Sequence, residues 1–283
     1  FLWRKEKPDS GGAGRWRGGN GAELAFVPHR TDGINLITIT SEVAVPGPGI
    51  FGGYPSSTNS FALVHDAKVA DQIAASGRMP GDLDELSGEV DLVPAKSFDR
   101  RPTPDDVWVF AWAGSSGYGD PLQREPERVA EDVAAGRVTA EWAERAYGVV
   151  LAVDGAVDQH ATATRRLEIL TERLEGVAPR GERGAAAGEG GAQRLTEYLE
   201  VVDGEVRSAP SGRSLGPASE NYKLGLVIRE LPLTEANPNV RDPAIYTDNK
   251  VVFRQLVDPE TGTLVATEIA VDDEPPQRDS TLA

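Results

Sequence analysis

The chain has 283 residues, of which 29 are basic and 45 acidic, so its formal net charge is −16. It contains no cysteine, which excludes disulfides, thiolate nucleophiles and every cysteine-ligated zinc or iron–sulfur site. Because nucleic-acid affinity comes largely from Lys and Arg, the acidic balance disfavours a nucleic-acid partner. No apolar run approaches the ~20 residues of a membrane helix and no secretory signal opens the sequence, so we expect a cytoplasmic chain without a membrane partner.

Strands are expected in the first part of the chain, where apolar and β-branched runs lie between turns rich in Gly, Pro and Asn. The clearest strand is 34–45, in which Ile37 and Ile39 alternate with threonines. Two further apolar runs are strand candidates: 60–65 and 107–113. Residues 47–59 contain too much Gly and Pro for regular structure and are expected to form a loop.

Two helices are predicted after Gly119 from their start and stop residues. Pro126 in the first turn and Gly136 just beyond the end delimit a helix over 125–135. Thr139 as N-cap and Gly148 as the stop residue delimit a second helix over 139–147.

A third helix is predicted over 159–174 from the spacing of its leucines. Leu167, Leu170 and Leu174 are expected to form the apolar stripe, whereas Arg173 is expected on the solvated face. The three helices together form a helical segment that follows the β-rich part of the chain.

A linker and domain boundary are predicted at 176–193, where eleven of eighteen residues are Gly or Ala. Few side chains are available there to bury, and glycine raises the entropy of any fixed path. Beyond it, three further runs are expected to form strands: 198–206, 250–256 and 263–271. The last two are separated by the turn-forming sequence DPETG.

Two glycine-rich elements are candidate binding sites. In residues 10–19 the small side chains permit close backbone approach, and Arg15 and Arg17 suit an anion. No Gly-Lys-Ser/Thr sequence follows, so this is not a phosphate loop of the Walker type. The structural alternative is a tight connection whose arginines form salt bridges or a subunit interface.

The second element, residues 114–121, lies between an expected strand and an expected helix, where backbone amides can face a ligand. Gly117, Tyr118 and Asp120 belong to it. The structural alternative is a turn that only ends the strand, because Gly, Asp and Pro all favour turns.

The three histidines lack the spacing of a shared metal site, and no Ser–His–Asp triad follows from spacing alone.

Residues 8–21 (PDSGGAGRWRGGNG) and 117–151, which begin GYGDPLQREP, resemble the C-terminal half of the hydantoinase B/oxoprolinase family over roughly residues 1–175. The His- and Asp-containing motifs of that family lie in its N-terminal half, so the resemblance assigns no catalytic residue to this chain. Five residues are instead expected to face substrate or a subunit interface: Arg15, Arg17, Gly117, Tyr118 and Asp120.

The segment 194–283 resembles the small subunit that accompanies acetone- and acetophenone-carboxylase-type enzymes. That family usually carries two Cys-x-x-Cys-Gly knuckles that hold zinc. The matching positions here are Ser208, Ser211, Asp258 and Thr261, each pair followed by Gly, with no sulfur among them. Because hydroxyl groups are poor zinc ligands, we expect a zinc-ribbon-like β domain that binds no metal.

These observations predict an α+β fold: a β-rich domain with a three-helix segment over 1–175, a linker over 176–193, and the small β domain over 194–283. The two resemblances together imply a subunit, inactive alone, of a multi-subunit ATP-dependent ketone carboxylase (a ligase) of the acetophenone carboxylase type, which forms a 3-oxo acid from a ketone and bicarbonate. They imply that this chain binds no cofactor, and that ATP and a divalent metal belong to partner subunits.

The implied partners are a hydantoinase A-like ATP-binding subunit and a chain that supplies the hydantoinase B N-terminal half. Two alternative functions stay open. One is a subunit of an ATP-dependent hydantoinase- or oxoprolinase-type lactam hydrolase, because accessory domains move between enzymes. The other is a purely structural assembly subunit.

Overall fold

The computed structural model describes residues 1–181 and 192–279. Within these residues the fold is mixed α/β, with antiparallel sheets and four α-helices. The helices are α1 Val69–Ser76, α2 Pro126–Ala134, α3 Ala140–Tyr147 and α4 Gln159–Arg173. The strands of the first part are β1 Trp3–Glu6, β2 Ala22–Phe26, β3 Leu36–Ile39, β4 Ser60–His65, β5 Glu89–Leu92, β6 Lys96–Arg100 and β7 Val107–Ala111. Those of the second part are β8 Gln193–Arg194, β9 Leu199–Val202, β10 Glu205–Ser208, β11 Ser214–Pro217, β12 Val227–Pro232, β13 Val251–Val257 and β14 Leu264–Val271.

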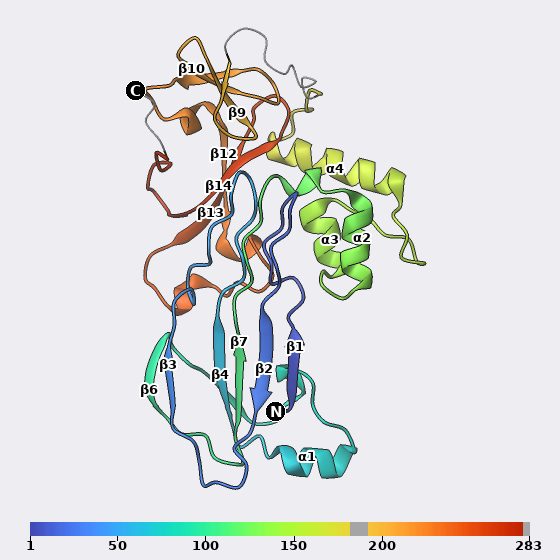
Figure 1. The fold of residues 1–283 in the computed structure, drawn as a ribbon, viewed down its shortest axis with the longest axis vertical. Helices are drawn as coiled ribbons and strands as arrows, with labels where there is room; N and C mark the ends of the chain where they lie inside the picture. The colour runs from blue at the N-terminus through green and yellow to red at the C-terminus, as the bar shows by residue number, and fades with distance from the viewer. Residues whose placement is uncertain (182–191, 280–283) are drawn as a thin grey trace.

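The first part of the chain forms a five-stranded antiparallel sheet in the order β1-β2-β7-β4-β5. Figure 1 shows β1, β2, β7 and β4 of this sheet side by side. One face buries a cluster that includes Ala25, Val64 and Val109 against α1. The opposite face carries Leu63 and Trp108, since successive strand residues point to opposite faces. β3 and β6 pair as a separate two-stranded ribbon beside this sheet (Figure 1).

The helices α2 and α3 begin and end close to the predicted residues. The Thr139 side chain accepts a hydrogen bond from the backbone amide of Trp142, which caps α3 at its start. Gly148 ends that helix in the left-handed conformation, at φ 61°, which glycine adopts without steric cost.

The C-terminal unit, residues 192–279, contains a four-stranded sheet in the order β11-β10-β9-β8 and a three-stranded sheet in the order β12-β13-β14. In the three-stranded sheet, the expected DPETG turn joins β13 to β14. This sheet packs beside the helices in Figure 1. One hydrophobic cluster joins Tyr54, Trp142, Phe253 and Leu264, so residues on both sides of the predicted linker share a core. Residues 182–191 of that linker lie outside the described residues, and the domain boundary stays a prediction.

Two local expectations were wrong. Only Leu36–Ile39 of the segment 34–45 is a strand, and its isoleucine face lies in solvent: Thr38 is buried, whereas Ile37 and Ile39 are 65% and 69% exposed. The reason is that β3 pairs only with β6, in a ribbon whose outer face lies open.

The apolar stripe of α4 also differs from the expectation. Leu167 is 55% exposed, whereas Ile169 and Arg173 are buried. These two residues are four apart and therefore share a face of the helix, and Arg173 has a buried anionic partner that periodicity does not show. No helix among the described residues is long and apolar enough to cross a membrane.

Candidate functional site

Three loops meet above the five-stranded sheet and form what we name the glycine-rich junction: residues 10–21, 47–58 and 114–121. Trp16 and Tyr118 exchange two backbone hydrogen bonds of 3.0 Å each, so the first and third loops run antiparallel. The structure therefore brings together both glycine-rich elements singled out in the sequence, although they lie about a hundred residues apart.

Close backbone packing explains the glycines of the junction. The amide of Gly117 donates to the Tyr54 carbonyl (2.9 Å), and its carbonyl accepts from the Ile50 amide (3.0 Å). A Cβ atom at Gly117 would lie 2.0 Å from the carbonyl oxygen of Ala13, and one at Gly12 would lie 2.2 Å from that of Tyr54. Because these neighbours are backbone atoms, they cannot rotate away, and the packing requires glycine.

Asp120 ends the junction in a fully buried ion pair with Arg173 of α4. Both nitrogens of the guanidinium fork donate to the carboxylate, with Nη1–Oδ2 2.7 Å and Nη2–Oδ1 3.0 Å. The backbone amides of Leu122 and Leu264 donate to the same carboxylate, at 3.0 and 2.8 Å. Burial disfavours the charged guanidinium, but the adjacent carboxylate holds the pKa of Arg173 above its ordinary value. Asp120 thus links the junction to α4 through Arg173 and to the start of β14 through the amide of Leu264.

Arg17 contacts a second carboxylate, that of the buried Asp132 on α2. Its Nε lies 3.3 Å from Oδ2, and Arg124 Nη2 lies 2.8 Å from the same oxygen. Arg137 lies further away, with Nη1 3.9 Å from Oδ1. Several guanidinium groups around one carboxylate fix α2 against the junction, which is the salt-bridge role that the sequence left open for Arg17.

Arg15 and Tyr118 lie at the accessible side of the junction. Arg15 is exposed and pairs with Glu197 of the C-terminal unit. The Tyr118 ring meets Phe51 edge-on, with centroids 5.3 Å apart. Trp16 is 53% exposed beside them. Of the five predicted residues, Arg15 is exposed and Tyr118 and Arg17 are half-buried, whereas Gly117 and Asp120 are buried.

The four positions that the resemblance aligns with zinc ligands lie together and form what we name the Asp258 cluster: Ser208, Ser211, Asp258 and Thr261. Ser211 Oγ donates to Asp258 Oδ2 (2.6 Å), and the Thr261 hydroxyl donates to Oδ1 (3.0 Å). The backbone amides of Glu260 and Thr261 also donate to Oδ1. These hydrogen bonds close the two turns onto each other.

The Asp258 cluster does not fit a tetrahedral zinc ion. It offers one carboxylate and no sulfur or imidazole, and the carboxylate already accepts hydrogen bonds on both oxygens. Burial alone would raise the pKa of Asp258, but the adjacent Ser208 and Ser211 hydroxyls and the two backbone amides hold it below its ordinary value. The zinc-ribbon assignment of this unit stays a prediction. In residues 1–181 and 192–279, no three His, Cys, Asp or Glu side chains are arranged to hold a metal ion.

Sequence reasoning missed the partners of these sites. Arg173 was expected in solvent and Asp132 was not singled out, yet both are buried beside predicted residues. The one available signal was the four-residue spacing of Ile169 and Arg173, which places the arginine on the buried face. Lys223, 2% exposed, was missed as well, because no helical or strand periodicity marks its short turn.

Residues 1–121 match the family described as hydantoinase B/oxoprolinase. The acetone carboxylase alpha subunit of Xanthobacter autotrophicus (strain ATCC BAA-1158 / Py2) is 31% identical over 196 residues, which cover 63% of this chain and 25% of the relative. The acetophenone carboxylase delta subunit of Aromatoleum aromaticum (strain DSM 19018 / LMG 30748 / EbN1) is 29% identical over 150 residues, 50% of this chain and 22% of the relative. The caprolactamase subunit beta of Pseudomonas jessenii is 28% identical over 158 residues, 56% of this chain and 24% of the relative.

A solved nucleotide-free structure of acetone carboxylase is similar to this fold, with a TM-score of 0.50 and 27% sequence identity over 63% of this chain and 25% of that chain. The predicted resemblance to the hydantoinase B/oxoprolinase family is confirmed over residues 1–121, and the chain is homologous to subunits of acetone and acetophenone carboxylases. The small-subunit resemblance of residues 194–283 stays a prediction. It is also homologous to a caprolactamase subunit. The chain spans about a quarter of the length of these relatives.

Proposed function

We propose that the chain is a subunit of a multi-subunit ATP-dependent ketone carboxylase of the acetophenone carboxylase type, which forms a 3-oxo acid from a ketone and bicarbonate. The observation that carries the proposal is the homology to carboxylase subunits, which extends over 63% of the chain for the acetone carboxylase relative. The solved acetone carboxylase structure, described as ATP-dependent, supports it through the similar fold.

The role of this chain is to position partner surfaces. Its buried charges are engaged internally, as for Asp120 with Arg173 and Asp132 with Arg17. The accessible side of the junction presents Arg15, Trp16 and Tyr118 on a rigid backbone. Aromatic and arginine side chains on a rigid surface are typical of the centres of protein–protein interfaces.

The proposed partners are a hydantoinase A-like subunit that binds ATP and a divalent metal, and a chain that supplies the hydantoinase B N-terminal half. Both follow from the family resemblance, and the complex is proposed to be a cytoplasmic hetero-oligomer. Under this proposal no cofactor is bound by this chain, and the chain alone has no carboxylase activity.

The second candidate is an ATP-dependent lactam hydrolase, which the homology to the caprolactamase subunit favours. To separate the two, the complex containing this chain is incubated with MgATP, ¹⁴C-bicarbonate and either acetone, acetophenone, caprolactam or 5-oxoproline. The carboxylase proposal expects ATP-dependent label in a 3-oxo acid product with a ketone. ATP-dependent ring opening without fixed label would contradict it.

The third candidate, a purely structural assembly subunit, is favoured by the internal engagement of Asp120 and Gly117. The variants Arg15→Ala and Tyr118→Ala in the complete complex distinguish it from a site role. Assembly that persists while carboxylation falls at least tenfold indicates that the junction faces substrate. Assembly and activity that fall together indicate an interface.

A further inference from the structure

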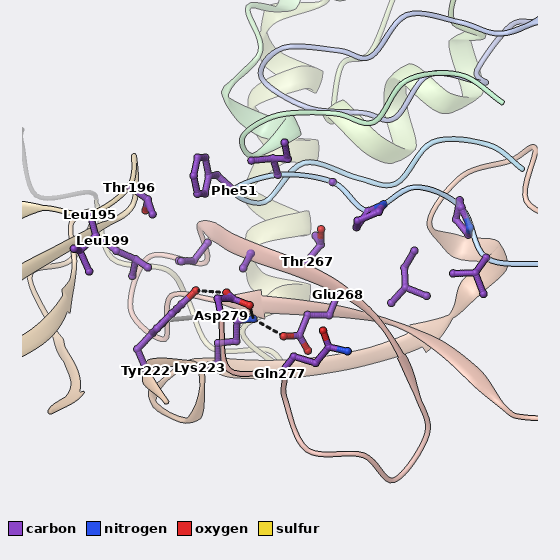
Figure 2. Close-up of a pocket in the computed structure, with 18 residues that line it drawn as sticks. Phe51, Leu195, Thr196, Leu199, Tyr222, Lys223, Thr267, Glu268, Gln277 and Asp279 are labelled. Carbon is purple, nitrogen blue, oxygen red and sulfur yellow. Dashed lines mark hydrogen bonds and ion pairs between the residues drawn. The ribbon is translucent and has the colours of Figure 1, made fainter. Parts of the chain in front are cut away.

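A cavity of about 770 Å³ lies beside the glycine-rich junction, between its 47–51 segment and the C-terminal unit (Figure 2). Its walls are mostly apolar and come from segments far apart in the sequence. Pro48, Ile50 and Phe51 line one side, and Leu199 and Val265 line the other. The volume lies within the ~300–1,000 Å³ range of small-molecule sites, which combine apolar walls with a few placed polar groups.

The charged groups that line this cavity form what we name the Lys223 cluster: Lys223, Glu268 and Asp279 (Figure 2). Lys223 Nζ lies 2.5 Å from Glu268 Oε1 and 2.5 Å from Asp279 Oδ1. The side chains of Lys223 and Glu268 are 2% and 6% exposed, whereas that of Asp279 is 52% exposed. Lys223 and Glu268 are therefore fixed in the protein interior, whereas Asp279 reaches Lys223 from the solvent side.

The third partner is delivered by a short tail that follows β14. Asn221 Nδ2 donates to the carbonyl of Pro276 (2.9 Å), which lays the tail along the turn that carries Lys223. Asp279 Oδ2 also accepts a hydrogen bond of 3.0 Å from the hydroxyl of Tyr222. The exposed carboxylate of Asp279 thus accepts hydrogen bonds from two donors that line the apolar cavity, the ammonium of Lys223 and the hydroxyl of Tyr222.

We propose that this cavity binds a small monocarboxylate with an apolar body, whose carboxylate takes the place of Asp279 on Lys223 and Tyr222. The exchange replaces one carboxylate with another, so the charge around the buried ammonium is unchanged. The apolar body gains burial against the walls. Asp279 competes for Lys223 from within the same molecule. The apparent affinity for the ligand is therefore its intrinsic affinity multiplied by the fraction of molecules in which Asp279 is not bound to Lys223.

Isothermal titration calorimetry with 3-phenylpropionate tests the proposal, and 3-phenylpropionamide is the neutral control of the same shape. We expect the acid to bind at least tenfold more tightly than the amide. The variant Asp279→Ala removes the competitor and should tighten acid binding at least threefold. The matched control Glu274→Ala removes an exposed acid of the same tail that does not line the cavity, and should leave the affinity unchanged.

Two further variants locate the ligand. Lys223→Met should weaken acid binding at least tenfold, and Ile50→Trp, at a position 53% exposed, should fill the cavity without touching the cluster. The proposal is overturned if acid and amide bind equally, if Asp279→Ala binds no acid, or if Ile50→Trp binds the acid as tightly as the unmodified chain. It is independent of the proposed function, because no carboxylation is measured.

Discussion

Two buried cations in this molecule, Arg173 and Lys223, meet their carboxylates in different ways. The Asp120 carboxylate, 2% exposed, accepts from Arg173 and from two backbone amides, so every direction around it is filled by the protein. The Asp279 carboxylate, 52% exposed, is brought to Lys223 by a tail. Both cations are buried and each has a buried carboxylate beside it, Asp120 for Arg173 and Glu268 for Lys223. Only Lys223 has a further carboxylate that is exposed, so the anchoring of the anion distinguishes the structural pair from the one proposed to be exchangeable.

The largest expected effect is that of removing the fixed anion. Asp120→Ala leaves Arg173 charged and buried without an anionic partner, with the Gly262 carbonyl still accepting from its Nη1; loss of such a partner typically costs about 3–5 kcal/mol in the free energy of unfolding. Urea denaturation measures it. The double variant Asp120→Ala/Arg173→Met should recover part of the loss, because it removes the unpaired charge. If the free energy of unfolding of Asp120→Ala lay within about 1 kcal/mol of that of the unmodified chain, a structural role for the pair would be contradicted.

The second prediction concerns the backbone packing that holds Asp120 in place. Gly117→Ala introduces a Cβ atom 2.0 Å from the carbonyl of Ala13 and should destabilise the chain by about 1–3 kcal/mol, through overpacking. Gly81→Ala is the matched control, because a Cβ there meets nothing within 4 Å. Thermal unfolding of the two variants side by side checks this, and equal stabilities would refute the close-packing explanation.

The third prediction concerns the Asp258 cluster. Asp258→Asn removes a carboxylate whose pKa is held low, so it should destabilise the chain by about 1–3 kcal/mol at pH 7. The stabilisation by ionised Asp258 is fully present above its unfolded pKa of ~3.9 and is lost as pH falls through its lower folded value. Unfolding measured from pH 7 to pH 2 should therefore show the two proteins converging in acid. A constant difference over this range would be inconsistent with the low pKa.

The smallest stability effect is expected for the exchangeable anion. Asp279→Ala should change the free energy of unfolding by about 0–1 kcal/mol, because the Asp279 carboxylate is 52% exposed and Lys223 keeps the buried carboxylate of Glu268. The measurement is the same urea titration used for Asp120→Ala. If Asp279→Ala were as damaging as Asp120→Ala, the distinction between the two carboxylates would be lost.

Local signals in the sequence predicted local structure well. Pro126, Thr139 and Gly148 placed α2 and α3 correctly, because capping and stop signals act within a few residues. The DPETG turn between β13 and β14 was found for the same reason. The family resemblance was carried by residues 8–21 and 117–151, and the family match over 1–121 contains the first of these motifs and the start of the second.

Long-range partners could not be predicted in the same way. Arg173 meets Asp120 across 53 positions, and Lys223 meets Asp279 across 56, so neither pair leaves a periodic trace. Ile37 and Ile39 show the same limit, because alternation identifies two faces of a strand but does not tell which face is buried. The chemistry of each site therefore depended on topology that only the fold provides.

Native mass spectrometry of the affinity-purified chain, isolated from its source under non-denaturing conditions, tests most directly the claim that it works as a subunit. We expect a stable hetero-oligomer of fixed stoichiometry that contains an ATP-binding subunit and hydrolyses ATP in the presence of ketone and bicarbonate. Recovery of the chain solely as a cooperatively folded monomer, with no ATP-binding chain in any complex, would contradict it.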